Sequence, residues 1–118
     1  MRFMFMIFHD EDAMNTLPGA EMQALVDGAL EYDEAIKRSG HHIVSDALQR
    51  ARTARTIRVR GGKVSTTDGP FAETKEQIGG FFLIEAKDMD EACAIASRFP
   101  PARIGTIEVR PVWELKHS

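Results

Sequence analysis

Two short segments of this 118-residue chain are apolar on both sides of an extended backbone. In the first, Arg2 to Phe8, phenylalanine and isoleucine on one side alternate with methionine and a further phenylalanine on the other. The second, Gly80 to Ala86, contains the apolar run Phe81-Phe82-Leu83-Ile84. Because successive side chains of a strand point to opposite faces, both segments are predicted to be central strands that are covered on both faces.

The other regular patterns predict two helices. Apolar residues at three- and four-residue spacing indicate a helix from Pro18 to Ser39, closed by Gly40. A second helix is expected from Met89 to Phe99, with Asp88 as its cap. Cys93 on that helix is interpreted as a small buried side chain.

Two edge strands and a hairpin complete the pattern. The less apolar segment His41 to Leu48 suits an edge strand, and so does Thr106 to Leu115, because Pro111 cannot donate to a ladder. Clean alternation around Gly61-Gly62 predicts a β-hairpin over Thr56 to Thr66. The acidic segment His9 to Asp12 is expected to be a loop.

This element order predicts an α+β fold, a ferredoxin-like split βαβ sandwich with an inserted β-hairpin. The expected spatial order of the main strands is fourth, first, third, second. Right-handed crossovers place both helices on one face, so the other face of the central strands exposes phenylalanine and methionine. We expect a second copy to cover that face, giving a homodimer with a cavity at the interface.

Composition narrows the functional classes. The length suits a single domain over residues 1–118, and the net charge of −3 gives no general attraction to nucleic acid or anionic membranes. A single cysteine and the lack of a long apolar run favour a cytoplasmic protein that does not span a membrane. No Cys pair or His-x-x-x-His spacing occurs, so no metal site is predicted, and no cofactor is expected.

The stretch from Asp68 to Gly80, DGPFAETKEQIGG, joins turn chemistry, a charged cluster and a double glycine directly before a buried strand. This stretch resembles the signature of the YCII-related proteins, specifically of their DGPF-domain group. The likeness extends to MRFMFMIFHDED, TIRVRGGKVSTTDGPF and IEVRPVWE. It implies a dimeric α/β barrel type of fold, and it implies no defined activity.

Charged groups at loop–strand junctions are the candidates for acid–base catalysis: Asp68, Glu73, Lys75, His9 and Asp10. A second set, from the fourth strand and the DGPF stretch, is the candidate ligand-binding group: Arg110, Glu108, Phe71 and Glu76. The alternative for both sets is structural, as turns and salt bridges whose charges pair with one another.

Three functions remain open. The first is a cofactor-independent small-molecule enzyme that uses acid–base residues in a cavity at the dimer interface. The second is a non-catalytic ligand-binding or regulatory module, which the resemblance links to extracytoplasmic-function sigma-factor signalling. The third is a dimer whose sheet face is closed by its partner and binds no ligand.

Overall fold

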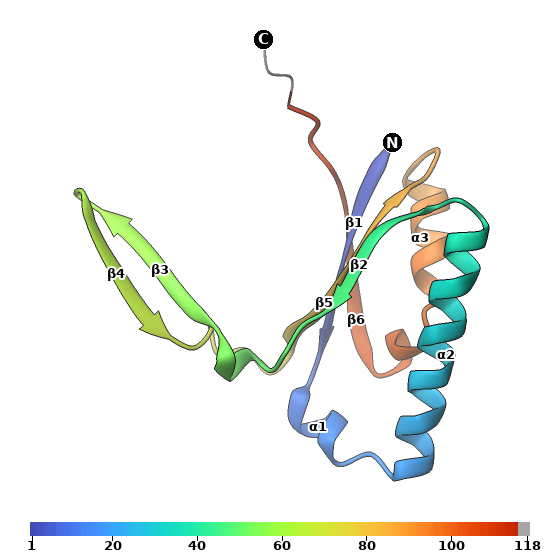
Figure 1. Ribbon diagram of the computed structural model, residues 1–118, viewed down its shortest axis with the longest axis horizontal. Helices are drawn as coiled ribbons and strands as arrows, with labels where there is room; N and C mark the ends of the chain where they lie inside the picture. Colours follow the sequence, from blue (N-terminus) through green and yellow to red (C-terminus); the bar gives the residue numbers. More distant parts are fainter. Residues whose placement is uncertain (116–118) are drawn as a thin grey trace.

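The computed structural model of the protein describes residues 1–115. A four-stranded antiparallel sheet has the helices on one face, and a separate two-stranded hairpin projects from the other side (Figure 1). The elements in chain order are β1 (Arg2–His9), α1 (Glu11–Asn15), α2 (Gly19–Arg38), β2 (His42–Ala47), η1 (Ala51–Thr53), β3 (Arg55–Arg60), β4 (Lys63–Asp68), β5 (Gln77–Glu85), α3 (Met89–Ser97), η2 (Pro100–Arg103) and β6 (Gly105–Pro111).

The predicted topology is confirmed. The strand order is β2-β5-β1-β6, so the two doubly apolar strands β1 and β5 are central. Each pairs antiparallel with the other, and β6 forms the outer edge next to β1. Pro111 is the last residue of this edge strand, where a missing backbone donor is tolerated.

The acidic segment after β1 is a helix, and the prediction of a loop was wrong. Asp10 caps α1, since its carboxylate accepts hydrogen bonds from the backbone N–H groups of Asp12 at 3.0 Å and Ala13 at 3.2 Å. Glu11 accepts a hydrogen bond from the N–H of Ala51 at 3.0 Å and thereby ties α1 to η1. The acidic side chains thus satisfy backbone donors at two helix starts.

Two further expectations need correction. Cys93 is exposed, because it lies on the solvent side of α3 while Ala92 and Ile95 face the core. The last strand ends at Pro111 and does not reach Leu115. Trp113, which lies beyond the strand, is 83% exposed.

The core lies between the sheet and the helices. Phe3, Phe5, Ile84 and Ile95 are its largest fully buried side chains. Tyr32 of α2 joins them, and its hydroxyl donates a 2.9 Å hydrogen bond to the carbonyl of Ile95 in α3. Burial raises the pKa of Tyr32 to about 12. The neutral phenol of Tyr32 therefore links α2 to α3 through this hydrogen bond.

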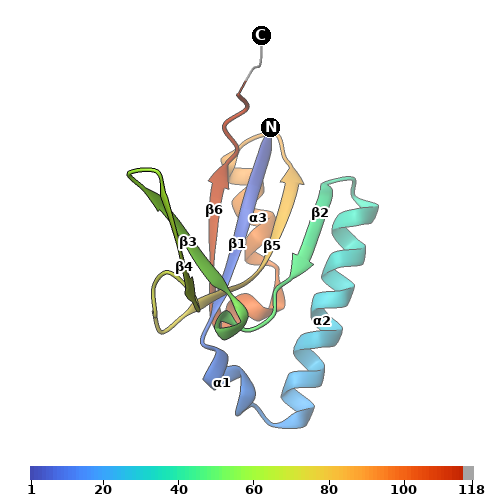
Figure 2. The same ribbon diagram turned by 60° about the vertical axis from the view of Figure 1, so that its left-hand side comes forward.

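The opposite side of the sheet has no such cover within residues 1–115. The helices pack on one face only, as Figure 2 shows. Side chains of the two central strands that point away from the helices are half-buried, and we call this surface the helix-free face: Met4, Met6, Phe8, Phe81 and Leu83. Among the described residues, no helix is long and apolar enough to cross a bilayer.

The hairpin of β3 and β4 stands apart from the sheet (Figures 1 and 2). Its turn is formed by Gly61 and Gly62, both with positive φ of 57° and 76°, as the sequence predicts. Every residue of β4 is exposed, and in β3 only Thr56 is half-buried. Nothing in the described part of the chain covers either face of this hairpin.

Candidate functional site

A cavity of about 410 Å³ lies on the helix-covered side of the sheet, between α2 and the ends of β1, β2 and β5. Most of its wall is apolar and includes Ile7, Met14, Phe82 and Phe99. The polar side chains in its lining that point to this side of the sheet are His9, Asp33 and Ser45. All three are half-buried, so an apolar pocket converges on a few polar groups.

His9 occupies a place that the double glycine creates. The β1–β5 register shifts between Ile7 and Phe8, which leaves Gly79 as an extra residue opposite β1. A Cβ atom on Gly79 would lie 1.9 Å from Cε1 of His9 and 2.5 Å from its Nδ1. The imidazole therefore lies directly on the glycine backbone, and any side chain at position 79 would displace it.

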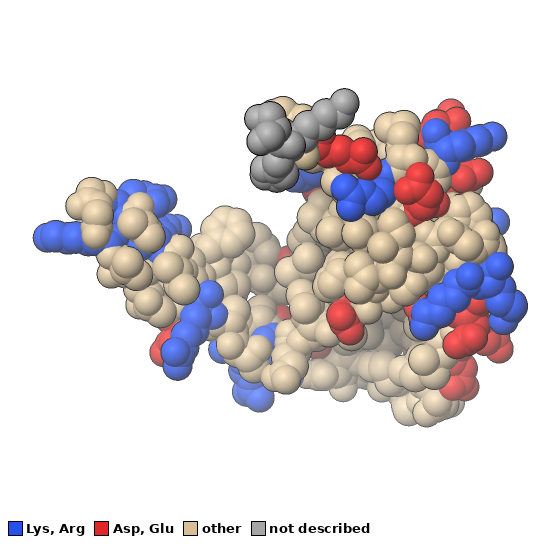
Figure 3. Space-filling view, turned by 45° about the horizontal axis from the view of Figure 1, so that its top comes forward, with Lys and Arg blue, Asp and Glu red and all other residues tan. Residues whose placement is uncertain are grey.

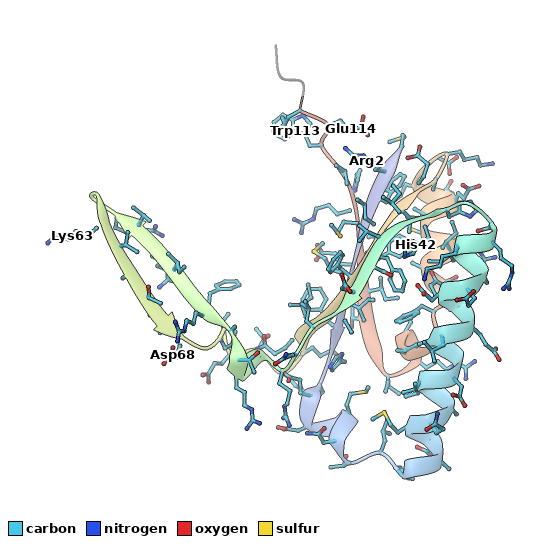
Figure 4. All side chains as sticks on the ribbon, viewed as in Figure 1. Arg2, His42, Lys63, Asp68, Trp113 and Glu114 are labelled. Carbon is cyan, nitrogen blue, oxygen red and sulfur yellow. The ribbon has the colours of Figure 1, made fainter. Side chains whose placement is uncertain are left out.

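Beside the cavity, four polar side chains form a connected group. Nε2 of His42 lies 2.7 Å from Oγ of Ser45, and that hydroxyl donates to Oδ1 of Asp33 at 3.4 Å. The other carboxylate oxygen of Asp33 pairs with Nζ of Lys37 at 2.8 Å. This hydrogen bond raises the pKa of Lys37. The group connects the cavity wall to the surface of α2, and Figure 4 shows His42 between β2 and α2.

Of the sequence-predicted catalytic residues, only His9 lines this cavity. In residues 1–115 its ring makes no hydrogen bond or ion pair, and its Cε1 and Nδ1 atoms lie against Gly79. Asp10, its neighbour, is engaged as the cap of α1. His9 thus lines the cavity, whereas Asp10 stabilises the start of α1.

The DGPF stretch lies at the base of the hairpin, where Figure 4 shows Asp68. Asp68 pairs with Arg55 at 3.6 Å, and the N–H of Gly69, with φ of 95°, donates to the carbonyl of Ala54 at 2.7 Å. The remaining candidates from this stretch are exposed except the half-buried Glu76: Phe71, Glu73 and Lys75. These residues lie in the segment between β4 and β5 and do not line the cavity.

Glu108 and Arg110 form an ion pair with each other on the outer face of β6. Their cross-strand neighbours are Met6 and Met4, so both belong to the side of the sheet without helices. No other described residue pairs with either of them. They border the helix-free face and do not reach the cavity.

A larger hollow of about 900 Å³ runs between α2 and the start of η2. Its charged lining residues, such as Glu31, Glu34 and Arg38, are exposed side chains of the helix surface. Exposed charges interact strongly with water and weakly with a ligand. We therefore place the candidate site at the smaller cavity, where the polar groups are half-buried.

Within residues 1–115, no group of three or more His, Cys, Asp or Glu side chains is arranged to hold a metal ion.

Asp33 and Ser45 were not predicted as site residues from the sequence. The signal for Asp33 is its position on the buried stripe of α2, four residues after Ala29 and three before Ile36. A carboxylate on such a stripe needs a partner. Ser45 gives a weaker signal, because a lone serine in an edge strand is ordinary.

These features define a small α+β protein with one half-buried histidine in an apolar cavity. The family model described as YCII-related domain matches residues 1–116, and the chain belongs to this family. The uncharacterized protein R00369 of Rhizobium meliloti (strain 1021) is 46% identical over 61 residues. That match spans about half of each protein, 50% of this chain and 49% of the relative.

A solved structure shares the fold. It is 5-chloro-2-hydroxyhydroquinone dehydrochlorinase (TftG) from Burkholderia phenoliruptrix AC1100, in complex with 2,5-dihydroxybenzoquinone. The TM-score is 0.55, and the comparison covers 100% of this chain and 96% of that one. The sequence identity is 16%, so the likeness concerns the fold alone.

Proposed function

We propose that this protein is a small-molecule enzyme that binds a compact organic ligand in the cavity beside α2 and uses His9 for proton transfer. The observation that supports this most is the imidazole of His9, which lies on the backbone of Gly79 and faces an apolar cavity. Histidine exchanges protons near neutral pH more readily than other side chains do.

The size and lining of the cavity define the ligand class. A volume of about 410 Å³ falls within the range of about 300 to 1,000 Å³ that small-molecule sites occupy. Phe82 and Phe99 favour a flat apolar body, while His9 and Ser45 favour a hydroxyl or carbonyl substituent. An oxygenated ring compound fits this description. The 2,5-dihydroxybenzoquinone bound by the similar dehydrochlorinase is a compound of that kind.

The chemistry that the cavity supports is proton abstraction from the bound molecule. In this proposal a ring nitrogen of His9 accepts the proton. The hydroxyl of Ser45, whose proton is donated to Asp33, offers its oxygen as an acceptor for a hydroxyl group of the ligand.

A second function, ligand binding without turnover, is favoured by one observation. No carboxylate within residues 1–115 lies at ion-pair distance from the ring of His9, because Asp10 caps α1. Catalytic histidines commonly have an orienting acidic partner. A regulatory binding module needs no such partner and would use the same cavity.

A thermal-shift screen of hydroxylated quinones and phenols, followed by turnover assays of the hits, separates these functions. For an enzyme, a hit is converted by the wild type, and the rate falls at least a hundredfold in His9→Gln. A hit that binds but is not converted indicates the binding module. If no hit binds wild type more tightly than His9→Trp, in which the larger ring fills the cavity, the site assignment is wrong.

We further infer that the protein acts as a homodimer through the helix-free face. Met6 and Phe81 are paired neighbours at the centre of this surface, and contiguous exposed apolar side chains are typical of interaction surfaces. The cavity is on the other side of the sheet, so dimerisation and ligand binding are independent claims.

A further inference from the structure

We propose that the β3–β4 hairpin is an arm that packs its apolar face on the helix-free face of a second copy of this chain. This inference rests on the homodimer proposed above. It adds a role for the β3–β4 hairpin, which contact between the two sheets alone does not explain. The occupant of the apolar surface is thus the hairpin of the partner in addition to its sheet.

The register of the hairpin sorts its residues into two different faces. Ile57 lies opposite Thr66 and Val59 opposite Val64, so these side chains leave the hairpin on one side. Thr56, Arg58 and Arg60 leave it on the other side, with their β4 partners. One face is thus apolar towards the tip, with the Arg55–Asp68 ion pair at its base, and the other is polar and basic.

The apolar side chains of this face are largely exposed in the single chain. Ile57, Val59 and Val64 are 64%, 57% and 68% exposed. Phe71, which follows the hairpin in the chain, is 80% exposed. An isolated two-stranded hairpin is at best marginally stable in water, and it needs further strands or another packed surface. The well-formed turn and ladder therefore imply a covering surface that one chain does not provide.

The helix-free face offers that surface. A cross-strand row of this face runs from Asp46 through Phe81 and Met6 to Glu108, with apolar residues in the centre and a carboxylate at each edge. The hairpin projects on the same side of the sheet, away from the helices (Figure 1). Two copies related by a twofold axis can therefore each place a hairpin against the sheet of the other.

Charge favours a second copy over an unrelated partner. The hairpin has four basic side chains against one acidic one, a net charge of +3, which leaves −6 for the rest of a chain whose total is −3. The Lys and Arg side chains of the hairpin stand out at the left of Figure 3, and Figure 4 shows Lys63 at the tip. The basic side chains lie mainly on the face that points away from the partner's sheet, so the opposite charges of arm and body favour the encounter of two copies.

Sedimentation equilibrium of three variants tests the arm. Val64→Asn changes the apolar face of the hairpin, Ser65→Asn changes the adjacent residue on its polar face, and Met6→Lys changes the centre of the helix-free face. We expect Val64→Asn and Met6→Lys each to raise the dimer dissociation constant at least tenfold, and Ser65→Asn to change it less than threefold. Val64 and Ser65 are both exposed in the chain, so neither substitution disturbs the core.

The other outcomes each contradict a specific part of the proposal. If Met6→Lys weakens the dimer and Val64→Asn does not, the arm is wrong and the sheet dimer stands. If Ser65→Asn weakens it as much as Val64→Asn, the apolar face is not the contact. A wild type that stays monomeric overturns both the dimer and the arm, while binding and turnover in the cavity, measured separately, decide the enzyme.

Discussion

The two faces of the central sheet differ in how far the chain itself buries them. On the helix-covered side, Phe3, Phe5 and Ile84 are at most 1% exposed, and Tyr32 ties two helices together. On the other side, the Met and Phe residues of the same strands are half-buried, and the hairpin that projects on that side is almost wholly exposed. One side is completed by the chain itself, whereas the other is not.

This difference separates stability from assembly. The helix-covered side contains the core and the cavity with His9, so folding and the proposed ligand site both belong to a single chain. The helix-free face, the hairpin and most of the DGPF stretch contribute little to the core of that chain. Substitutions on the two sides should therefore differ in whether their effects depend on protein concentration.

The largest expected effect is a contrast between adjacent residues of β1. Phe5→Ala removes a fully buried ring and should lower the free energy of unfolding by about 3 to 5 kcal/mol at any protein concentration. Met6→Ala should cost about 1 kcal/mol at high dilution, because its side chain is half-buried in one chain. Urea unfolding at two concentrations measures both. Equal losses of unfolding free energy for the two variants at high dilution would contradict the difference between the two faces.

The next effect is the pH dependence of the free energy of unfolding, which reports on the helix-covered side. Burial raises the pKa of Tyr32, the only tyrosine, from 10.0 to about 12. The fold favours the neutral phenol, so its contribution is complete below pH 10 and is lost as the pH rises through the folded-state value. Between about pH 10 and 12 the wild type should lose about 2 to 3 kcal/mol relative to Tyr32→Phe. Parallel pH profiles for the two proteins would show that the phenol is not buried.

A smaller effect concerns the cavity. Gly79→Ala should lower the free energy of unfolding by about 1 to 3 kcal/mol, because the added methyl group overlaps the ring of His9. The NMR signals of the His9 imidazole should shift with it. Gly19→Ala is the matched control, since no atom lies within 4 Å of its added Cβ, and it should stay within about 0.5 kcal/mol of wild type. An unchanged His9 signal in Gly79→Ala would refute the assigned contact.

The smallest effect lies at the rim of the helix-free face. Glu108→Gln breaks an ion pair with Arg110 whose side chains are 46% and 68% exposed in one chain. At high dilution this should change stability by less than about 1 kcal/mol. If the proposed dimer forms through this face, the partner removes water from the pair, and the same change should weaken association measurably. A salt-insensitive dissociation constant that is identical for both proteins would place this rim outside the interface.

The sequence predicts the fold better than the site, for physical reasons. Doubly apolar strands, Pro111 at an edge and the glycine pair of the hairpin are local signals, and each is confirmed. The helix α1 was missed because five residues are too few for periodicity, although Asp10 was available as a cap. The contact between His9 and Gly79 joins residues far apart in the chain, and no local pattern encodes it.

The DGPF stretch illustrates the same limit. Its turn is local and was predictable from Gly69 and Pro70. The side chains of Glu73 and Lys75 resemble an acid–base pair in sequence, yet the chain places them on the surface at the hairpin base. Only the three-dimensional arrangement shows that this stretch supports the hairpin and that the polar residues of the cavity come from β1, α2 and β2.

Amide hydrogen exchange of the hairpin, read by mass spectrometry across a dilution series, tests the central claim most directly. If a second copy completes the helix-free side, peptides covering residues 55–68 should exchange slowly at concentrations where the dimer forms and rapidly once it dissociates, while core peptides of α2 stay protected throughout. Hairpin amides that exchange rapidly at every concentration, or that stay protected in a monomer, would contradict the account.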